Sequence, residues 1–175
     1  MNELVMKVCV VGEGGTGKTS MLHRLVKDEF ISDMKMTIVT GLMTHSIEVD
    51  SQKIIYQLWD FAGENRFRFF LPNYLKGAKA VILCYDMTRF PTFNNLNEWY
   101  SIVESNIDLS KMVVYLVGNK KDLKQKKAVF SETVDEWKDK RKIDRTWTSS
   151  ALTGENIDEI YQTLGKDLIE KRDEL

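Results

Sequence analysis

Apolar runs and amphipathic stretches alternate along the whole chain. The apolar runs predict strands at residues 5–11, 42–49, 53–59, 80–85 and 112–117, with a short one near Trp147. The amphipathic stretches predict helices at residues 18–27, 93–105, 132–140 and 157–171, and a weaker one around residues 70–76. Asp50-Ser51-Gln52 joins the second and third strands, which indicates a hairpin.

This order of elements predicts an α/β fold built on one mainly parallel sheet. We expect six strands, one of them an antiparallel hairpin strand, with right-handed crossovers that place helices on both faces. The length of 175 residues is that of one domain, so a single domain is predicted over residues 1–175. Ligands of such sheets bind at the carboxyl ends of the strands, where the chemistry is therefore expected.

Composition narrows the class of protein. Apolar residues make up 43% and charged residues 29%, which favours a globular chain over a disordered one. The formal net charge of −1 gives no electrostatic reason to expect nucleic acid as a partner. Cys9 and Cys84 lie in apolar runs and are expected to be buried reduced thiols, which suits a cytoplasmic protein. We expect no lipid anchor in this chain, because its last residues lack a cysteine for prenylation, and membrane association stays open.

A glycine-rich motif carries the first chemical signal. GEGGTGKT at Gly12–Thr19 fits G-x-x-x-x-G-K-[ST], with a predicted strand before it and a predicted helix after it. Backbone N–H groups of such a loop turn inward around phosphate oxygens, Lys18 adds a point charge, and the Thr19 hydroxyl can bind Mg²⁺. The alternative, a glycine-rich turn without a ligand, is disfavoured by these flanks. The predicted nucleotide contacts are Gly12, Glu13, Gly14, Gly15, Thr16, Gly17, Lys18, Thr19 and Ser20.

A second motif indicates which base is bound. GNKKD ends at Asp122 and follows the predicted strand 112–117, which brings Asn119 and Lys120 to the same pocket. A carboxylate at Asp122 can accept from both N1–H and the 2-amino group of guanine, whereas adenine offers neither donor. A weaker signal is SSAL, whose residues Ser150, Ala151 and Leu152 could add backbone contacts to the base oxygen.

WDFAGENRF, residues 59–67, places two acids around a glycine. Asp60 stands at the end of an apolar strand, where an acid often holds a metal, and Glu64 comes directly after Gly63.

Five segments together resemble the nucleotide motifs of the Ras superfamily, in order and at family spacing. They are Gly12–Thr19, Thr37, Asp60–Gly63, Asn119–Asp122 and Ser150-Ala151. Within that superfamily, RFRFF, KGA, YDMT and FNNLNEW are most similar to the Rab branch. The resemblance covers nearly the whole chain and implies a P-loop small G-domain, a monomeric GTPase that binds GTP or GDP with Mg²⁺ and hydrolyses GTP slowly. Its role would be a regulatory switch in membrane traffic or related signalling.

The same resemblance implies roles for particular residues. Thr37 would reach Mg²⁺ only in the GTP state, Asp60 would hold Mg²⁺ through water, and the Gly63 amide would bind the γ-phosphate. Phe30 matches the aromatic residue that packs on guanine. The residues alone are also consistent with two other interpretations: Phe30 as an ordinary core residue and Thr37 as a solvent-exposed loop residue. Exchange factors, GTPase-activating proteins and effectors would bind through the loops around Thr37 and Gly63.

Three departures from the family pattern affect these expectations. Val39-Thr40-Gly41-Leu42 replaces the usual glycine and phenylalanine after Ile38, which weakens any transfer of Rab effectors. Met34 replaces the tyrosine over the γ-phosphate, and Glu64 replaces the glutamine that faces the attacking water. The expected catalytic residues are Lys18, Thr37, Gly63 and Glu64. Two hypotheses follow: a slow GTPase switch, or a scaffold that holds GTP and barely hydrolyses it.

Overall fold

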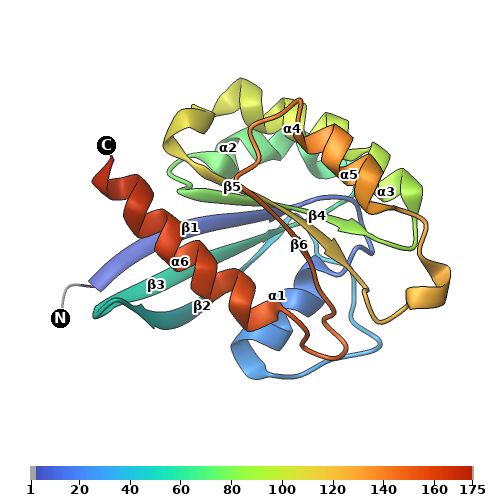
Figure 1. Cartoon of the computed structure of the whole chain (residues 1–175), viewed down its shortest axis with the longest axis horizontal. Helices are drawn as coiled ribbons and strands as arrows, with labels where there is room; N and C mark the ends of the chain where they lie inside the picture. Colours follow the sequence, from blue (N-terminus) through green and yellow to red (C-terminus); the bar gives the residue numbers. More distant parts are fainter. Residues whose placement is uncertain (1–2, 175) are drawn as a thin grey trace.

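The computed structural model describes residues 3–174 and is built on one six-stranded sheet (Figure 1). Its strand order is β2-β3-β1-β4-β5-β6. Four neighbouring pairs are parallel, and β2 is antiparallel to β3, so the expected mainly parallel sheet is confirmed. The strands are β1 (Glu3–Val11), β2 (Thr40–Val49), β3 (Gln52–Phe61), β4 (Ala80–Asp86), β5 (Val113–Asn119) and β6 (Arg145–Thr148).

Helices cover both faces of the sheet, as predicted (Figure 1). One face carries α1 (Lys18–Lys27) and α6 (Ile157–Asp173). The other carries α2 (Leu71–Leu75), α3 (Phe90–Asn94), α4 (Leu96–Asn106) and α5 (Ser131–Lys138). Three short 3-10 segments complete the order: η1 (Asn65–Phe70), η2 (Leu109–Lys111) and η3 (Lys124–Lys126). Within residues 3–174, no helix has both the length and the apolar character needed to cross a bilayer.

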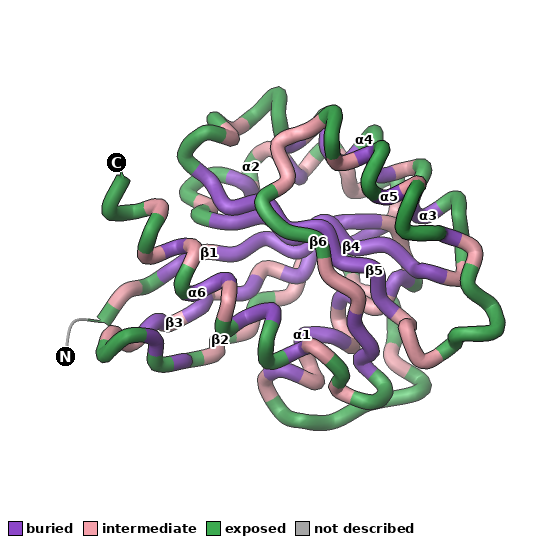
Figure 2. The backbone as a smooth tube through the Cα atoms, viewed as in Figure 1, coloured by how far each residue is buried: buried purple, intermediate pink, exposed green. Residues whose placement is uncertain are grey.

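The central strands form the core of the molecule (Figure 2). All residues of β4 and β5 are buried, which explains their nearly continuous apolar sequence, since helices cover both of their faces. The edge strand β2 instead alternates between more and less exposed positions. Cys9 and Cys84 are buried free thiols, as expected.

The hairpin between β2 and β3 is confirmed, with a tighter turn than predicted. Asp50 and Ser51 adopt φ values of 47° and 64°, and Val49 pairs with Gln52, which is therefore the first residue of β3 rather than part of the turn. Two successive positive φ values match the twist of the flanking strands in a two-residue turn. The hairpin brings the start of β2 beside the end of β3, where Thr40 pairs with Phe61.

Two helix predictions were wrong in their bounds. The single helix predicted over residues 93–105 is a pair, α3 and α4, and begins at Phe90. The apolar periodicity starts only at Phe93, whereas the first turn of α3 contains Pro91, whose fixed φ suits that position. The helix predicted around residues 70–76 is the short α2, preceded by the 3-10 turn η1.

Candidate nucleotide-binding site

The glycine-rich loop lies between the end of β1 and the start of α1, as the motif requires. Gly12 has a φ of 144°, and a Cβ added there would lie 2.1 Å from the Cys84 carbonyl oxygen of β4. Only glycine allows the loop to leave the sheet so close to the neighbouring strand. The loop and residues 34–37 line one cavity, together with Phe61 and Gly63.

Lys18 reaches back across this loop. Its side chain is buried, and its Nζ donates to the carbonyl oxygens of Gly12 at 2.9 Å and Glu13 at 2.7 Å. Burial lowers the pKa of the Lys18 ammonium, and the Asp60 and Glu13 carboxylates oppose that shift. Lys18 itself lines the cavity formed by the glycine-rich loop, and a buried ammonium there is suited to an anion such as phosphate.

Three oxygen-bearing side chains meet beside Lys18. The Thr19 hydroxyl donates to Asp60 Oδ2, and Thr37 Oγ1 lies 2.8 Å from Thr19 Oγ1 and 3.1 Å from Asp60 Oδ2. Asp60 is buried, and its Oδ1 has no hydrogen-bond partner among residues 3–174. Burial raises the pKa of Asp60, which the Thr19 hydrogen bond and the Lys18 charge oppose. Hard oxygen ligands around an unsatisfied carboxylate fit a magnesium ion.

Asn119 connects the glycine-rich loop to the loop that follows β6, residues 149–151. Its Nδ2 donates to the carbonyl oxygens of Thr16 at 3.1 Å and Gly17 at 3.4 Å. Its Oδ1 accepts from Ser149 Oγ and from the Ala151 amide, both at 3.3 Å. A single buried amide thus holds the two loops together at the carboxyl end of β5.

Asp122 is oriented by the same loop after β6. Ser150 Oγ donates to Asp122 Oδ1 at 2.6 Å, and Ser150 is itself fully buried. This contact fixes one carboxylate oxygen, which favours a defined direction for the other. Leu152 is exposed, and its carbonyl oxygen accepts from Arg24 Nη2 at 2.7 Å.

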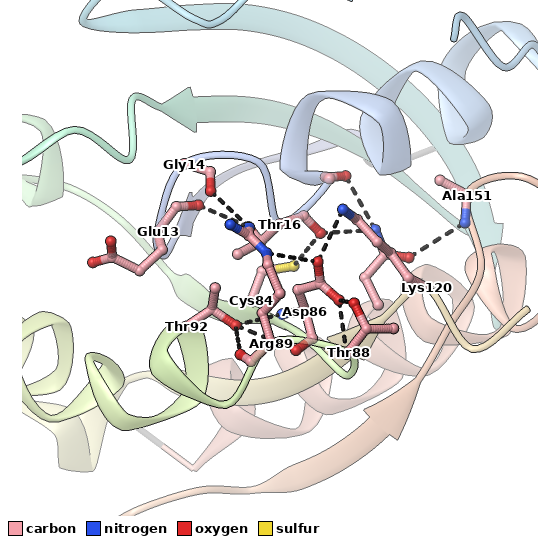
Figure 3. Close-up of polar contacts among 12 residues, drawn as sticks. Glu13, Gly14, Thr16, Cys84, Asp86, Thr88, Arg89, Thr92, Lys120 and Ala151 are labelled. Carbon is pink, nitrogen blue, oxygen red and sulfur yellow. Dashed lines mark hydrogen bonds and ion pairs between the residues drawn. The ribbon is translucent and has the colours of Figure 1, made fainter. Parts of the chain in front are cut away.

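Sequence reasoning missed a polar cluster at the end of β4 (Figure 3). Asp86 is buried and pairs with Lys120 Nζ at 2.9 Å and Arg89 Nε at 3.0 Å. Burial would raise the pKa of Asp86, but hydrogen bonds from Thr88 and Lys120 outweigh it and hold the pKa below its ordinary value. Arg89 Nη2 also donates to the Gly14 carbonyl at 3.0 Å. The available signal was an acid at a strand end, the same signal that singled out Asp60.

Two of the predicted residues, Phe30 and Glu64, do not line the cavity. Phe30 is 40% exposed and is not among the lining residues, whereas Met34 does line the cavity. Gly63 lines it as well, but the adjacent Glu64 does not. Glu64 Oε2 instead lies 2.6 Å from Arg66 Nε, in a pair that is open to solvent.

The fold and the site define a P-loop nucleotide-binding domain with the topology of a small G-domain. Residues 7–170 match the model of the Ras family, and the chain therefore belongs to the Ras family. Family membership supports a GTP-binding regulatory switch of the Rab-like kind, because Ras-family proteins are GTPases in general.

Curated relatives agree with this assignment. The chain is 33% identical over 162 residues to Ras-related protein RABA2a of Arabidopsis thaliana, covering 93% of this chain and 74% of the relative. It is 34% identical over 179 residues to Ras-related protein YPTC6 of Chlamydomonas reinhardtii, with coverages of 98% and 82%. Ras-related protein RABA4b of Arabidopsis thaliana is also 34% identical, over 93% of this chain and 71% of its own length.

Proposed function

We propose that this protein cycles between GTP and GDP with Mg²⁺ and hydrolyses GTP slowly, as a Rab-like switch in membrane traffic or related signalling. The observation that carries the proposal is the link made by Asn119, which ties the phosphate-binding loop to the loop that orients Asp122. The loop proposed to bind the phosphates and the residue proposed to bind the base are then connected by hydrogen bonds. A guanine-reading carboxylate at a fixed distance from the phosphate loop suits a guanine nucleotide.

The proposed metal site consists of Thr19, Thr37 and Asp60. Their oxygens converge beside Lys18, and Asp60 Oδ1, which has no hydrogen-bond partner among residues 3–174, would be free to accept from a metal-bound water. When bound, Mg²⁺ would offset the charge of the β- and γ-phosphate oxygens. Lys18 would neutralise the outer phosphates, the Gly63 amide would donate to the γ-phosphate, and Phe30 would cover the guanine after a rearrangement of its loop.

Removing the Thr37 hydroxyl tests this assignment. In Thr37→Ala, we expect the affinity for a non-hydrolysable GTP analogue with Mg²⁺ to fall about tenfold, while GDP affinity stays within about twofold. The reason is that Thr37 would reach the metal only in the GTP state. Thr44→Ala, which removes an exposed hydroxyl from β2, is the matched control. Fluorescence titration measures both affinities, and an equal loss for the two nucleotides would contradict the assignment.

The surface around the two loops supports protein partners. Met36 and Ile38 beside Thr37, Leu42 at the start of β2 and Phe69 in η1 are large apolar side chains that are between 56% and 78% exposed. Effectors, exchange factors and GTPase-activating proteins are therefore proposed to bind there.

A second candidate function is a scaffold that retains GTP without useful hydrolysis. The pairing of Glu64 with Arg66 favours it, because Glu64 is then directed to a neighbouring side chain instead of the cavity. Intrinsic hydrolysis would not exceed the roughly 10⁻⁴ s⁻¹ scale of unassisted small GTPases.

Glu64→Gln is expected to speed GTP hydrolysis about tenfold. At about 5 Å and an effective dielectric near 20, a carboxylate and a phosphate charge repel by roughly 3 kcal/mol, and an exposed arginine offsets only part of this. A glutamine amide can accept from the attacking water and donate to a γ-phosphate oxygen.

Single-turnover rates of the wild type, Glu64→Gln and Glu64→Ala distinguish the possibilities, with the exposed Glu104→Gln as control. A slower glutamine variant would mean that Glu64 acts as a general base. Three equal rates would mean that Glu64 is a solvated loop residue without a role.

A further inference from the structure

Arg68, in η1, lies between two acids that come from different parts of the chain. Its Nη2 donates to Glu13 Oε1 in the phosphate-binding loop, and its Nη1 donates to Glu98 Oε2 on α4. Only 12% of the Arg68 side chain is exposed, although arginine is usually solvated. Glu13 is the less exposed partner, at 20%, whereas Glu98 is 65% exposed.

Trp99 of α4 completes this arrangement. Its ring is fully buried, and the Arg68 guanidinium lies 4.6 Å from the ring centroid, within the range of a cation–π contact. The indole Nε1–H donates to Glu13 Oε1 at 3.0 Å, the same oxygen that accepts from Arg68. Glu13, Arg68 and Trp99 are called the latch below.

Glu13, one residue of the latch, also contacts the loop that lines the cavity through its backbone carbonyl. The Glu13 carbonyl accepts from Lys18 Nζ at 2.7 Å and from Thr16 Oγ1 at 2.9 Å, while its carboxylate points away from the Asp86 cluster (Figure 3). At the other end of the latch, Arg68 follows Gly63 by five residues. Glu13 therefore joins the loop that would hold the phosphates to the segment that carries Glu64.

We propose that Arg68 is a positioning residue that, through the Glu13 carboxylate, holds segment 64–70 on the phosphate-binding loop. The segment is then placed by contacts within the protein, to which a contact from the Gly63 amide to the γ-phosphate would add under the proposed function. Any effect of this segment on a bound nucleotide rests on the proposed function, whereas the contacts of the latch do not. Charge-assisted hydrogen bonds to a largely solvent-shielded guanidinium are strong enough to order a short segment.

The test compares two substitutions that each remove one negative charge from Arg68. Glu13→Gln weakens the latch, and Glu98→Gln is the matched control at the exposed side of the same guanidinium. In the GDP form, we expect amide hydrogen exchange in residues 64–70 to become about tenfold faster in Glu13→Gln and to change less than about threefold in Glu98→Gln. With a GTP analogue, the difference between Glu13→Gln and the wild type should shrink to about twofold.

The Trp99 indole N–H resonance provides a signature that loss of stability alone would not move. It should shift in Glu13→Gln and stay in place in Glu98→Gln. Arg68→Lys, which keeps the charge but cannot reach both acids as a planar fork, should reproduce the faster exchange and serves if Glu13→Gln does not fold.

Unchanged exchange in Glu13→Gln and in Arg68→Lys would overturn the proposal, and so would equal effects of Glu13→Gln and Glu98→Gln. If the protein bound no guanine nucleotide, the proposed function would fail, but the same comparison without nucleotide would still decide the latch.

Discussion

Asp122→Asn is expected to lower the affinity for GDP about a thousandfold, because a site built around buried polar groups rejects a mispaired partner strongly. The wild-type carboxylate accepts from two guanine donors, whereas an asparagine amide would face them with N–H groups of its own. Ser150 can still donate to the remaining amide oxygen, since it bonds Asp122 Oδ1 at 2.6 Å, so the side chain should keep its direction. Xanthosine diphosphate should bind better to the variant, because its oxygen at position 2 accepts from the amide.

Calorimetric titration with GDP, ADP and xanthosine diphosphate measures this change. The wild type should prefer GDP over ADP by at least about a thousandfold, and Asp139→Asn, an exposed acid-to-amide change at the end of α5, should leave that preference intact. Equal affinity of the wild type for ADP and GDP would refute guanine recognition by Asp122.

Gly63→Ala is expected to slow GTP hydrolysis about a hundredfold, because a shift of roughly 1 Å in a reacting geometry has an effect of that size. A Cβ at Gly63 would lie 2.1 Å from Gly14 N, 2.3 Å from the Glu13 carbonyl carbon and 2.6 Å from Gly12 O. All three atoms belong to the backbone of the phosphate-binding loop, so the segment after Gly63 must move away from it. GDP affinity should change little, since the loop itself remains.

Gly41→Ala is the matched control, because its added Cβ would meet only Asp60 Cβ, at an ordinary contact distance of 3.8 Å. Single-turnover hydrolysis and GDP titration separate the two effects. A Gly63→Ala variant with wild-type turnover would show that close contact between the two segments is not needed for hydrolysis.

Much of the fold follows from local patterns. Helix α1 spans residues 18–27 as predicted, since the loop glycines precede it and an amphipathic pattern continues to Lys27. The parallel strands follow from apolar runs, and the carboxyl ends of those strands bring Lys18, Asp60 and Asn119 together in any sheet of this order. The placement of the motifs was therefore predictable, although the roles of their residues stay predictions.

Contacts set by tertiary packing were not predictable. Arg89 and Gly14 are 75 residues apart, and Arg68 and Glu13 are 55 apart, so no local spacing indicates either pair. The sequence contains 26 acids and 25 lysines or arginines, which leaves many alternative pairings for every charge. Glu64 shows that even a near neighbour can be unpredictable. Its partner Arg66 lies only two residues away, and the sequence pattern still did not indicate that these two side chains would pair.

The β2–β3 hairpin gives the two loops that flank the cavity a common anchor. One loop ends where β2 begins and the other starts where β3 ends, and the two junctions are joined by a bond of 2.9 Å from the Ala62 amide to Val39 O and one of 3.0 Å from Thr40 Oγ1 to Asp60 O. One end of each loop is therefore bonded to one end of the other loop, so these two ends should move together. Immobilising either loop removes conformational freedom that its neighbour would otherwise have to lose, so the two should become ordered cooperatively.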